Sequence, residues 1–488
     1  MRSPSPLPGL AGLRAQRGVA TLVVVMVLFF VVAMVAAYTS RNLIFEQKTS
    51  ANNYRSQVAF EAAEAGVEWA LAMLNGGLID NNCDRSAAAG GTSFQQRYLR
   101  ITAAAGITNG RITSATSWPT AASDNWPACV LSPTGWGATG TCKCPSGAAL
   151  APGEAPQPAF RVWPVLPDPP TPPPTPSPLN PNPGQFTLHA NGCTRMPAGT
   201  GECLDLDPLA SAGDAVASLR VVVALRPGLN TMPSAAITAQ GGVALPAAPA
   251  SLALVNADRA SNGLTINAGG AIANASTIVA ESLPGTPGEL TVIENDPKLA
   301  SLSVLAAGGT LGAGERMFVS QFGMRRALYR AQPGLRGCPG FEMASCTSST
   351  LAAALARHPN RILWVDGDLS LTAGTVLGTN SAPVLLVING STLRLDQGAT
   401  VVGMIYMTGN GAATPGLSTI ELPSGGITEI RGALVAEAGL AISYPSGTPA
   451  ATNRLKVTYD REVLNVLRTS YGSWVRLPGG WRDFRTEQ

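Results

Sequence analysis

The fold is decided near the start of the chain, by the sequence Arg17-Gly18-Val19-Ala20-Thr21-Leu22-Val23 and the uncharged run that continues from it to Tyr38. From Val19 to Tyr38 the run holds 20 residues, enough helix to cross a hydrocarbon core of about 30 Å. Three arginines and no acid precede it, so the positive-inside bias predicts a cytoplasmic N-terminus and a periplasmic bulk. The positions expected to face lipid or a filament core are Val19, Leu22, Val23, Val27, Phe30, Met34 and Tyr38.

The helical pattern continues beyond Tyr38 but becomes amphipathic. Apolar residues recur at steps of three and four on one face, and Asn75-Gly76-Gly77 ends the pattern. We therefore predict one long helix over 19–76, with 19–38 as its membrane or filament-core segment. The predicted contact stripe consists of Tyr54, Val58, Ala62, Ala65, Trp69 and Met73.

The rest of the chain has the composition of repetitive β structure. With 488 residues it exceeds one typical domain, and it combines 53 glycines and 39 prolines with only 13% charged residues. Residues 77–230 are expected to form a small antiparallel sheet that packs on the helix, with an irregular insertion over 77–157. Within this part, 164–183 holds eleven prolines and is expected to be an extended loop.

Residues 231–458 carry a repeat that favours a β-solenoid. The strand-like segment 365–371 is answered by 388–395, displaced by 23 residues, with glycines at the turns. A β-sandwich is the alternative. A helical insert is expected over 315–357, and 459–488 is expected to be a C-terminal cap or tail. The predicted class is thus α+β: a long N-terminal helix packed on a small antiparallel sheet, followed by a Gly-rich β-solenoid-like region.

The position of Gly18 before the apolar run, rather than after it, resembles a class III prepilin leader over 1–18. The segment Ala59-Phe60-Glu61-Ala62-Ala63-Glu64-Ala65-Gly66 and the ending Gly480-Trp481-Arg482-Asp483-Phe484 resemble PilX-type pilus assembly proteins. The resemblance implies cleavage between Gly18 and Val19 and N-methylation of Val19. An uncut single-pass anchor and a Sec signal cut after Ala37 are the alternatives.

One residue departs from the usual prepilin pattern. Prepilins usually carry Glu where this chain has Val23, and that carboxylate is thought to neutralise the terminal amine of a neighbouring subunit inside an apolar bundle. A subunit at the filament tip has no neighbour above it to neutralise. PilX-type proteins and GspK-type pseudopilins share this omission, so the resemblance implies a priming or tip role.

Eight cysteines in an exported chain favour disulfides. The two short intervals predict the pairs Cys193–Cys203 and Cys338–Cys346, and the pairing of Cys83, Cys129, Cys142 and Cys144 stays open. Little else suggests chemistry: there are two histidines and no nucleophile, phosphate-loop or zinc motif. Asp366 and Asp368 could ligate calcium, but a turn role is favoured. We expect no enzyme, cofactor or metal.

The predicted function is that of a minor pilin-like subunit of type IV pilus assembly that contributes to adhesion. Its expected partners are the prepilin peptidase, other minor pilins, the major pilin, the inner membrane and a tip adhesin. A net charge of +3 gives no reason to expect nucleic acid. The subunit is expected in the inner membrane before assembly and in the pilus at the cell surface after assembly. The alternatives are a type II secretion pseudopilin of the GspK type and a membrane-anchored β-solenoid adhesin or carbohydrate-binding protein; Arg394 and Asp396 are too few to suggest a polysaccharide lyase.

Overall fold

The computed structural model describes most of the chain. The described residues are 17–86, 91–102, 111–114, 126–132, 141–144, 157–165, 184–195, 203, 214–247, 252–302, 315–340, 343–409, 417–423, 426–444 and 454–483. Residues 1–16 of the predicted leader (1–18) and residues 166–183 of the proline-rich loop (164–183) lie outside these residues.

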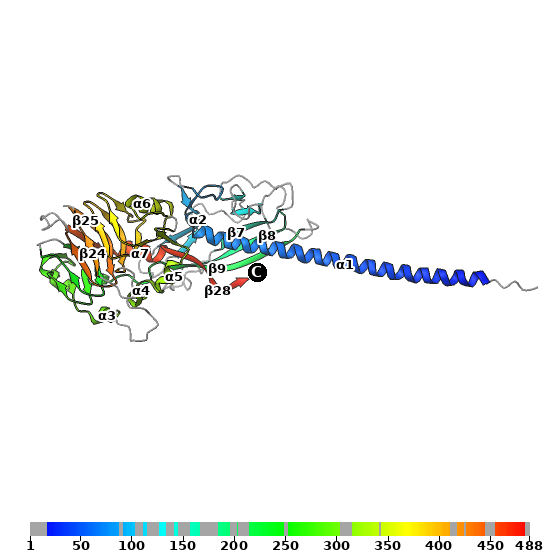
Figure 1. The fold of residues 1–488 in the computed structure, drawn as a ribbon, viewed down its shortest axis with the longest axis horizontal. Coiled ribbons are helices and arrows are strands. Elements are labelled where there is room, and N and C mark those ends of the chain that lie inside the picture. Colours follow the sequence, from blue (N-terminus) through cyan, green and yellow to red (C-terminus); the bar gives the residue numbers. More distant parts are fainter. Residues whose placement is uncertain are drawn as a thin grey trace, which may run out of the picture.

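A single long helix projects from a β-rich body (Figure 1). The helix α1 spans Arg17–Leu74, and its 58 residues give a length on the order of 90 Å. Its N-terminal half stands clear of the body, and its C-terminal part lies along a sheet. The observed ends agree with the helix that the sequence predicts over 19–76, to within two residues.

The sheet beside α1 is antiparallel and six-stranded, in the order β28-β9-β8-β7-β5-β6. α1 contacts β7, β8 and β9. Their inward side chains alternate along each strand and bury Phe160, Leu188 and Val221 against the helix. The strands are β5 (Ala128–Val130), β6 (Cys142–Lys143), β7 (Ala159–Val165), β8 (Gln185–Cys193), β9 (Val216–Pro227) and β28 (Gly472–Arg482).

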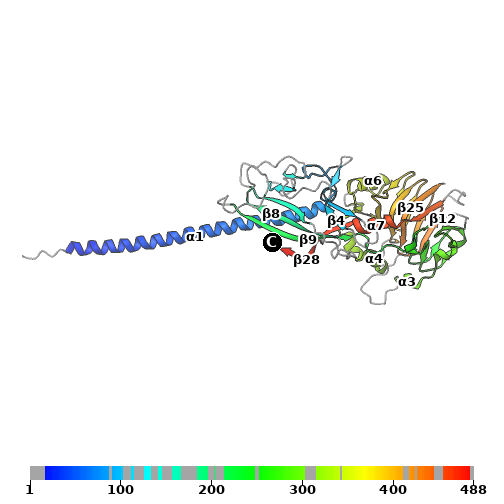
Figure 2. The same ribbon diagram turned by 180° about the vertical axis from the view of Figure 1, so that it is seen from behind.

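Residues 472–482 belong to this sheet, whereas the sequence predicts a cap or tail over 459–488. β28 pairs antiparallel with β9, so that Trp474 lies beside Leu225 (Figure 2). The chain therefore leaves the sheet at the end of β9 and returns at β28. The outgoing and returning segments are in contact. The backbone N–H of Gly228, which follows β9, donates to the carbonyl of Tyr471, which precedes β28, at 2.7 Å. The distal body is thus inserted between two neighbouring strands of one sheet.

The distal body is built mainly from two open sheets of parallel strands. One has twelve strands, with the main order β15-β12-β27-β25-β23-β21-β18-β17, and the other has six, in the order β14-β11-β26-β24-β22-β19. The larger sheet contains β10 (Ile237–Ala239), β12 (Leu252–Val255), β13 (Ile266–Ala268), β15 (Ile278–Glu281), β16 (Val292–Ile293), β17 (Leu335–Cys338), β18 (Ile362–Asp366), β20 (Val376–Leu377), β21 (Val384–Asn389), β23 (Thr400–Met407), β25 (Ile427–Ala436) and β27 (Arg454–Tyr459). The smaller sheet contains β11 (Val243–Ala244), β14 (Ile272–Ala273), β19 (Leu369–Leu371), β22 (Thr392–Leu395), β24 (Ser418–Glu421) and β26 (Leu440–Ser443).

The two segments of the sequence repeat pair directly. Asp366 of β18 lies beside Asn389 of β21, 23 residues later, and Leu369 of β19 lies beside Leu393 of β22. Side chains between the two sheets form one apolar core with residues such as Val387, Ile405 and Leu434. This register is the one that stacked coils would produce, but neither sheet is closed.

Helices cover the distal body where it meets the antiparallel sheet (Figure 1). In the part expected to be a helical insert, the structure has α4 (Glu315–Phe322), α5 (Arg326–Arg330) and α6 (Ser348–Arg357). Phe318, Phe322 and Tyr329 pack edge-on or tilted against one another, and the two phenylalanines also pack against Tyr406 of β23. These aromatic contacts fix α4 and α5 on the larger sheet.

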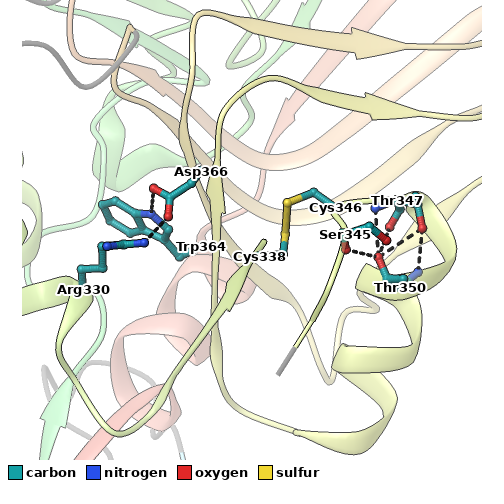
Figure 3. Close-up of a disulfide and its surroundings, with 8 residues drawn as sticks. All are labelled: Arg330, Cys338, Ser345, Cys346, Thr347, Thr350, Trp364 and Asp366. Atoms are coloured by element: carbon teal, nitrogen blue, oxygen red, sulfur yellow. Dashed lines mark hydrogen bonds and ion pairs between the residues drawn. A yellow bond between two sulfur atoms is a disulfide. The ribbon is translucent and has the colours of Figure 1, made fainter. Parts of the chain in front are cut away.

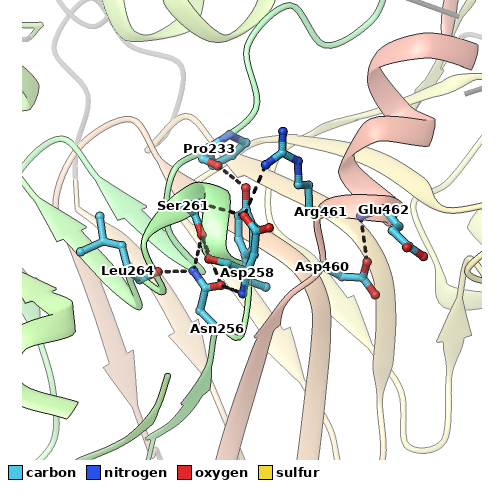
Figure 4. Close-up of polar contacts among 9 residues, drawn as sticks. Pro233, Asn256, Asp258, Ser261, Leu264, Asp460, Arg461 and Glu462 are labelled. Atoms are coloured by element: carbon cyan, nitrogen blue, oxygen red, sulfur yellow. Dashed lines mark hydrogen bonds and ion pairs between the residues drawn. The ribbon is translucent and has the colours of Figure 1, made fainter. Parts of the chain in front are cut away.

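The return of the chain to the antiparallel sheet passes through α7 (Arg461–Ser470). Asp460 begins this helix by accepting hydrogen bonds from the backbone N–H groups of Glu462 and Val463, both at 3.1 Å (Figure 4). Arg461 approaches Asp258 to 3.7 Å. This contact links the start of α7 to the segment that follows β12, the strand that pairs with β27.

Short elements complete the description. They are β1 (Leu78–Ile79), β2 (Thr92–Ser93), α2 (Phe94–Tyr98), β3 (Leu99–Thr102), β4 (Arg111–Ser114), η1 (Arg259–Ser261), η2 (Ala275–Thr277), η3 (Gly288–Thr291) and α3 (Pro297–Ala300).

Candidate functional site

The N-terminal half of α1 is the most exposed apolar surface of the described residues. Every large apolar side chain from Leu22 to Tyr38 is more than half exposed, including the sequence-predicted positions Leu22, Val23, Val27, Phe30, Met34 and Tyr38. The helix is long and apolar enough to cross a membrane, judged by length and composition. Because so much exposed apolar surface is unfavourable in water, this rod needs lipid or other protein around it.

The predicted cleavage point lies at the start of this rod. The peptide bond between Gly18 and Val19 falls in the first turn of α1, which begins at Arg17. The side chains of both residues, and residues 1–16, are outside the described part.

The sheet begins to cover α1 at Ala59, and the covered face is made of small residues. Ala59, Ala63 and Ala70 are fully buried. The stripe predicted from the sequence runs along one border of this face: Ala62 is buried, Trp69 is half-buried, and Tyr54 is 69% exposed. Small side chains let the helix lie close to the strands, so the centre of the contact shifts away from the larger residues.

This close approach depends on Gly192 of β8. A Cβ atom at Gly192 would lie 2.1 Å from the carbonyl oxygen of Ala59 and 2.3 Å from the nitrogen of Ala63. These distances are shorter than any real contact, so only glycine fits where the strand backbone touches the helix backbone.

The C-terminal end of α1 is held by the last strand of the chain. The Asn75 side chain donates to the carbonyls of Leu71 and Trp474, both at 2.9 Å, and accepts from the backbone N–H of Trp474 at 2.9 Å. The indole N–H of Trp474 also donates to Gln95 at 3.2 Å. A residue that the sequence marks as a helix stop is therefore also the link to β28.

Two buried arginines of the distal body bind the same end of α1. Arg336 of β17 donates to the carbonyl of Asn75 at 2.7 Å, and Arg361, immediately before β18, donates to the carbonyls of Leu74 and Gly76. The last carbonyls of a helix lack intrahelical partners and carry partial negative charge, so cations are favourable there. Burial, and then the positive charge of Arg336, lower the pKa of Arg361 to about 9.

We call this set, Asn75, Arg336, Arg361 and Trp474, the helix-end junction. Asn75 directly follows α1, Arg336 lies in β17, Arg361 directly precedes β18, and Trp474 lies in β28. The sequence does not reveal the role of either arginine, because isolated arginines in β-rich sequence carry no signal of a partner 261 or 287 positions away.

Asp366 and Asp368, which the sequence suggested as possible calcium ligands, both form hydrogen bonds to the neighbouring strand or to the turn beside it. Asp366 accepts from the indole N–H of Trp364 at 2.8 Å and from Asn389 at 3.0 Å, and it pairs with Arg330 (Figure 3). Burial opposes ionisation of Asp366, but these hydrogen bonds and the charge of Arg330 outweigh it and lower its pKa. Asp368 accepts from the backbone N–H groups of two residues that follow β21, at 2.9 and 2.8 Å.

A second ion pair fixes α5 to the larger sheet. Arg326, one helical turn before Arg330, donates to both carboxylate oxygens of Glu437 at 2.6 and 2.7 Å. Glu437 is fully buried, and this burial raises its pKa to about 8 against the opposing effect of Arg326. Within the described ranges, no three His, Cys, Asp or Glu side chains gather as a metal site would require.

All eight cysteines lie in four disulfides. The structure joins Cys193 to Cys203 and Cys338 to Cys346. It also joins the four cysteines that the sequence left open, as Cys83–Cys144 and Cys129–Cys142. Cys129–Cys142 joins β5 to β6, the two strands at one edge of the antiparallel sheet, and Cys83–Cys144 joins the segment after β1 to the residue that follows β6.

Comparison with known proteins identifies the helix. Residues 17–68 match the family model described as PilX N-terminal, a match that lies entirely within α1. The chain has a PilX-type N-terminus. The PilX-type match supports a pilin-like function in a type IV pilus and agrees with the exposed apolar half of α1. No curated protein matches the chain.

Among solved structures, the competence-associated pilin ComZ from Thermus thermophilus is 11% identical, and the alignment covers 88% of this chain and 97% of that one. Its TM-score is 0.20, so this likeness carries no argument about the fold. The PilX-type assignment of the N-terminus therefore rests on α1.

Proposed function

We propose that the chain is a minor pilin-like subunit of type IV pilus assembly. The observation that carries the proposal is the division of α1, whose residues 17–68 match the PilX N-terminal model: its N-terminal half is apolar and exposed, and its C-terminal part is built into the body. Such a helix can anchor the chain in the inner membrane before assembly and then pack among other helices in a filament core. The β-rich body would remain outside the membrane and outside the filament core. The N-terminus would be cytoplasmic and the bulk periplasmic before assembly.

Maturation would proceed by cleavage between Gly18 and Val19 and methylation of Val19 by the prepilin peptidase. The apolar residue Val23, in place of the usual Glu, supports a priming or tip position beside other minor pilins and the major pilin, because a tip subunit has no amine above it to neutralise.

The parallel, in-register strands of the distal body support a β-solenoid whose coils stack away from α1. A body of this kind, placed at the far end of the helix, would be the part available to contact a tip adhesin or a surface (Figure 1).

The test is the N-terminal residue of the mature protein, determined by mass spectrometry in cells with and without the prepilin peptidase. We expect methylated Val19, dependent on the peptidase, and loss of both cleavage and piliation in Gly18→Ala. Gly12→Ala, within the leader, is the matched control and should mature normally. Pili that persist in Gly18→Ala would overturn the assembly proposal. An intact Met1 would favour a membrane-anchored adhesin, and a start at Tyr38 would mean a Sec-released protein.

A further inference from the structure

The part of α1 between the apolar run and the covered face carries a distinct surface. Tyr38, Arg41, Ile44, Phe45 and Lys48 line one shallow patch of the helix, which we call the collar. Tyr38 is 69% exposed, Phe45 is 71% exposed and Ile44 is 51% exposed. Every residue of α1 from Ala20 to Tyr54 is exposed, so none of the described residues covers the collar.

The collar is aromatic and cationic on one face. Tyr38, Arg41, Phe45 and Lys48 follow one another at steps of three, four and three, which places them on one side of a helix. The acid of this segment, Glu46, lies eight residues after Tyr38, which is about 80° around the helix from it. Aromatic residues and long cations on one helix face are typical of segments that lie in a membrane interface.

The collar side chains also lean toward the apolar run. Helical side chains tilt toward the N-terminus, and here that direction leads back to the 19–38 segment. Arg41, Phe45 and Lys48 lie about 5, 10 and 15 Å beyond Tyr38 along the axis. The polar layer on each side of a bilayer is roughly 5 to 8 Å thick, and long Lys and Arg side chains reach several ångströms along a helix.

We propose that the collar binds anionic lipid headgroups at the periplasmic face of the inner membrane and so sets the depth of α1 before assembly. The proposal rests on the membrane-anchored state of the proposed function. Continuity with the apolar run and the two cations favour lipid as the occupant. Acidic side chains of a neighbouring subunit are the rival occupant, and the experiment separates the two.

The test uses the full chain in lipid nanodiscs, with an environment-sensitive fluorophore on Phe45→Cys. Gln47→Cys is the matched control, because it has nearly the same height but faces away from the collar. Quenching by spin-labelled lipid measures the preference for phosphatidylglycerol over phosphatidylethanolamine. We expect a preference at position 45 that exceeds the one at 47 and falls with salt. The double substitution Arg41→Gln and Lys48→Gln should reduce the lipid preference at position 45 about 25-fold, because each cation is expected to contribute a factor of about five.

Equal quenching at positions 45 and 47, or a preference that survives removal of both cations, would overturn the proposal. So would the absence of a lipid preference at both positions in the chain that keeps Arg41 and Lys48, if the double variant also loses cross-linking to neighbouring subunits, since the collar would then be a subunit contact. The result is independent of maturation: the Gly18 experiment tests cleavage, whereas the collar is present in the cut and the uncut chain alike.

Discussion

Arg361 donates a hydrogen bond to the backbone carbonyl of Leu74, the last residue of α1, across 287 positions of sequence. The guanidinium also reaches the carbonyls of Gly76 and Gly472, at 3.2 and 3.3 Å. One buried cation thus joins the end of α1 to β28, the strand that returns from the distal body. A displacement of the distal body would act directly on α1 through this contact.

Arg361→Met should therefore destabilise the whole chain. The substitution keeps much of the volume but leaves the buried carbonyls of Leu74 and Gly76 without this donor, at a cost of about 1 to 3 kcal/mol. Denaturant unfolding measures it. Arg394→Met is the control, because Arg394 is half exposed and its distance to Asp396 is 3.8 Å. Equal stability of Arg361→Met and the wild type would show that the junction does not hold the helix end.

Gly192→Ala should separate α1 from the sheet. The new methyl group would occupy the space of the Ala59 carbonyl, so the helix must move away from β8 and lose contacts along its buried face. We expect a lower unfolding temperature and faster proteolysis within residues 59–74. Thr187→Ala on the same strand, at a half-buried position, should change little. A Gly192→Ala protein as resistant to protease as the wild type would contradict the close packing described here.

Stability should fall as the pH drops from about 6.5 to 4 because of His189. Burial, and then the charge of Arg220, lower the pKa of His189 to about 4. In this window the unfolded chain binds a proton at this histidine and the folded chain does not, so acid favours unfolding, by about 2 kcal/mol after allowance for partial exposure. The measurement is the unfolding free energy against pH.

His189→Gln is the comparison for that series, because it removes the titrating group and keeps a polar side chain. Buried Glu437, whose pKa is raised, acts in the opposite sense and contributes equally to both proteins. The difference between the two curves therefore isolates His189. Parallel curves between pH 6.5 and 4 would contradict the prediction.

The four disulfides should contribute different amounts to the free energy of unfolding. Cys83–Cys144 closes 61 residues and Cys193–Cys203 closes 10, so the loop-entropy model predicts that opening the longer bridge costs about 1.5 kcal/mol more. Double Cys→Ser variants of each pair, compared by thermal unfolding, test this. A larger loss for the Cys193–Cys203 pair would show that local packing, rather than loop length, dominates.

Several features could be predicted from the sequence because they depend on neighbouring residues. The helix over 19–76 follows from an unbroken helical pattern, and the direct pairing of Asp366 with Asn389 follows from a 23-residue repeat. The contact stripe on the helix was predicted only approximately. Its large residues mark the border of the buried face, whereas the centre is defined by alanines, which show no pattern in a chain so rich in alanine.

The sequence by itself determined the long apolar helix, its PilX-type character and the β-rich nature of the remainder, since hydrophobic period, charge and turn residues act over short distances. Only the tertiary structure decided that β28 returns to pair with β9 and that Arg336 and Arg361 bind the end of α1. Those contacts join residues hundreds of positions apart. They exist because buried helix-end carbonyls need donors, and only the folded chain brings donors from the distal body to that place.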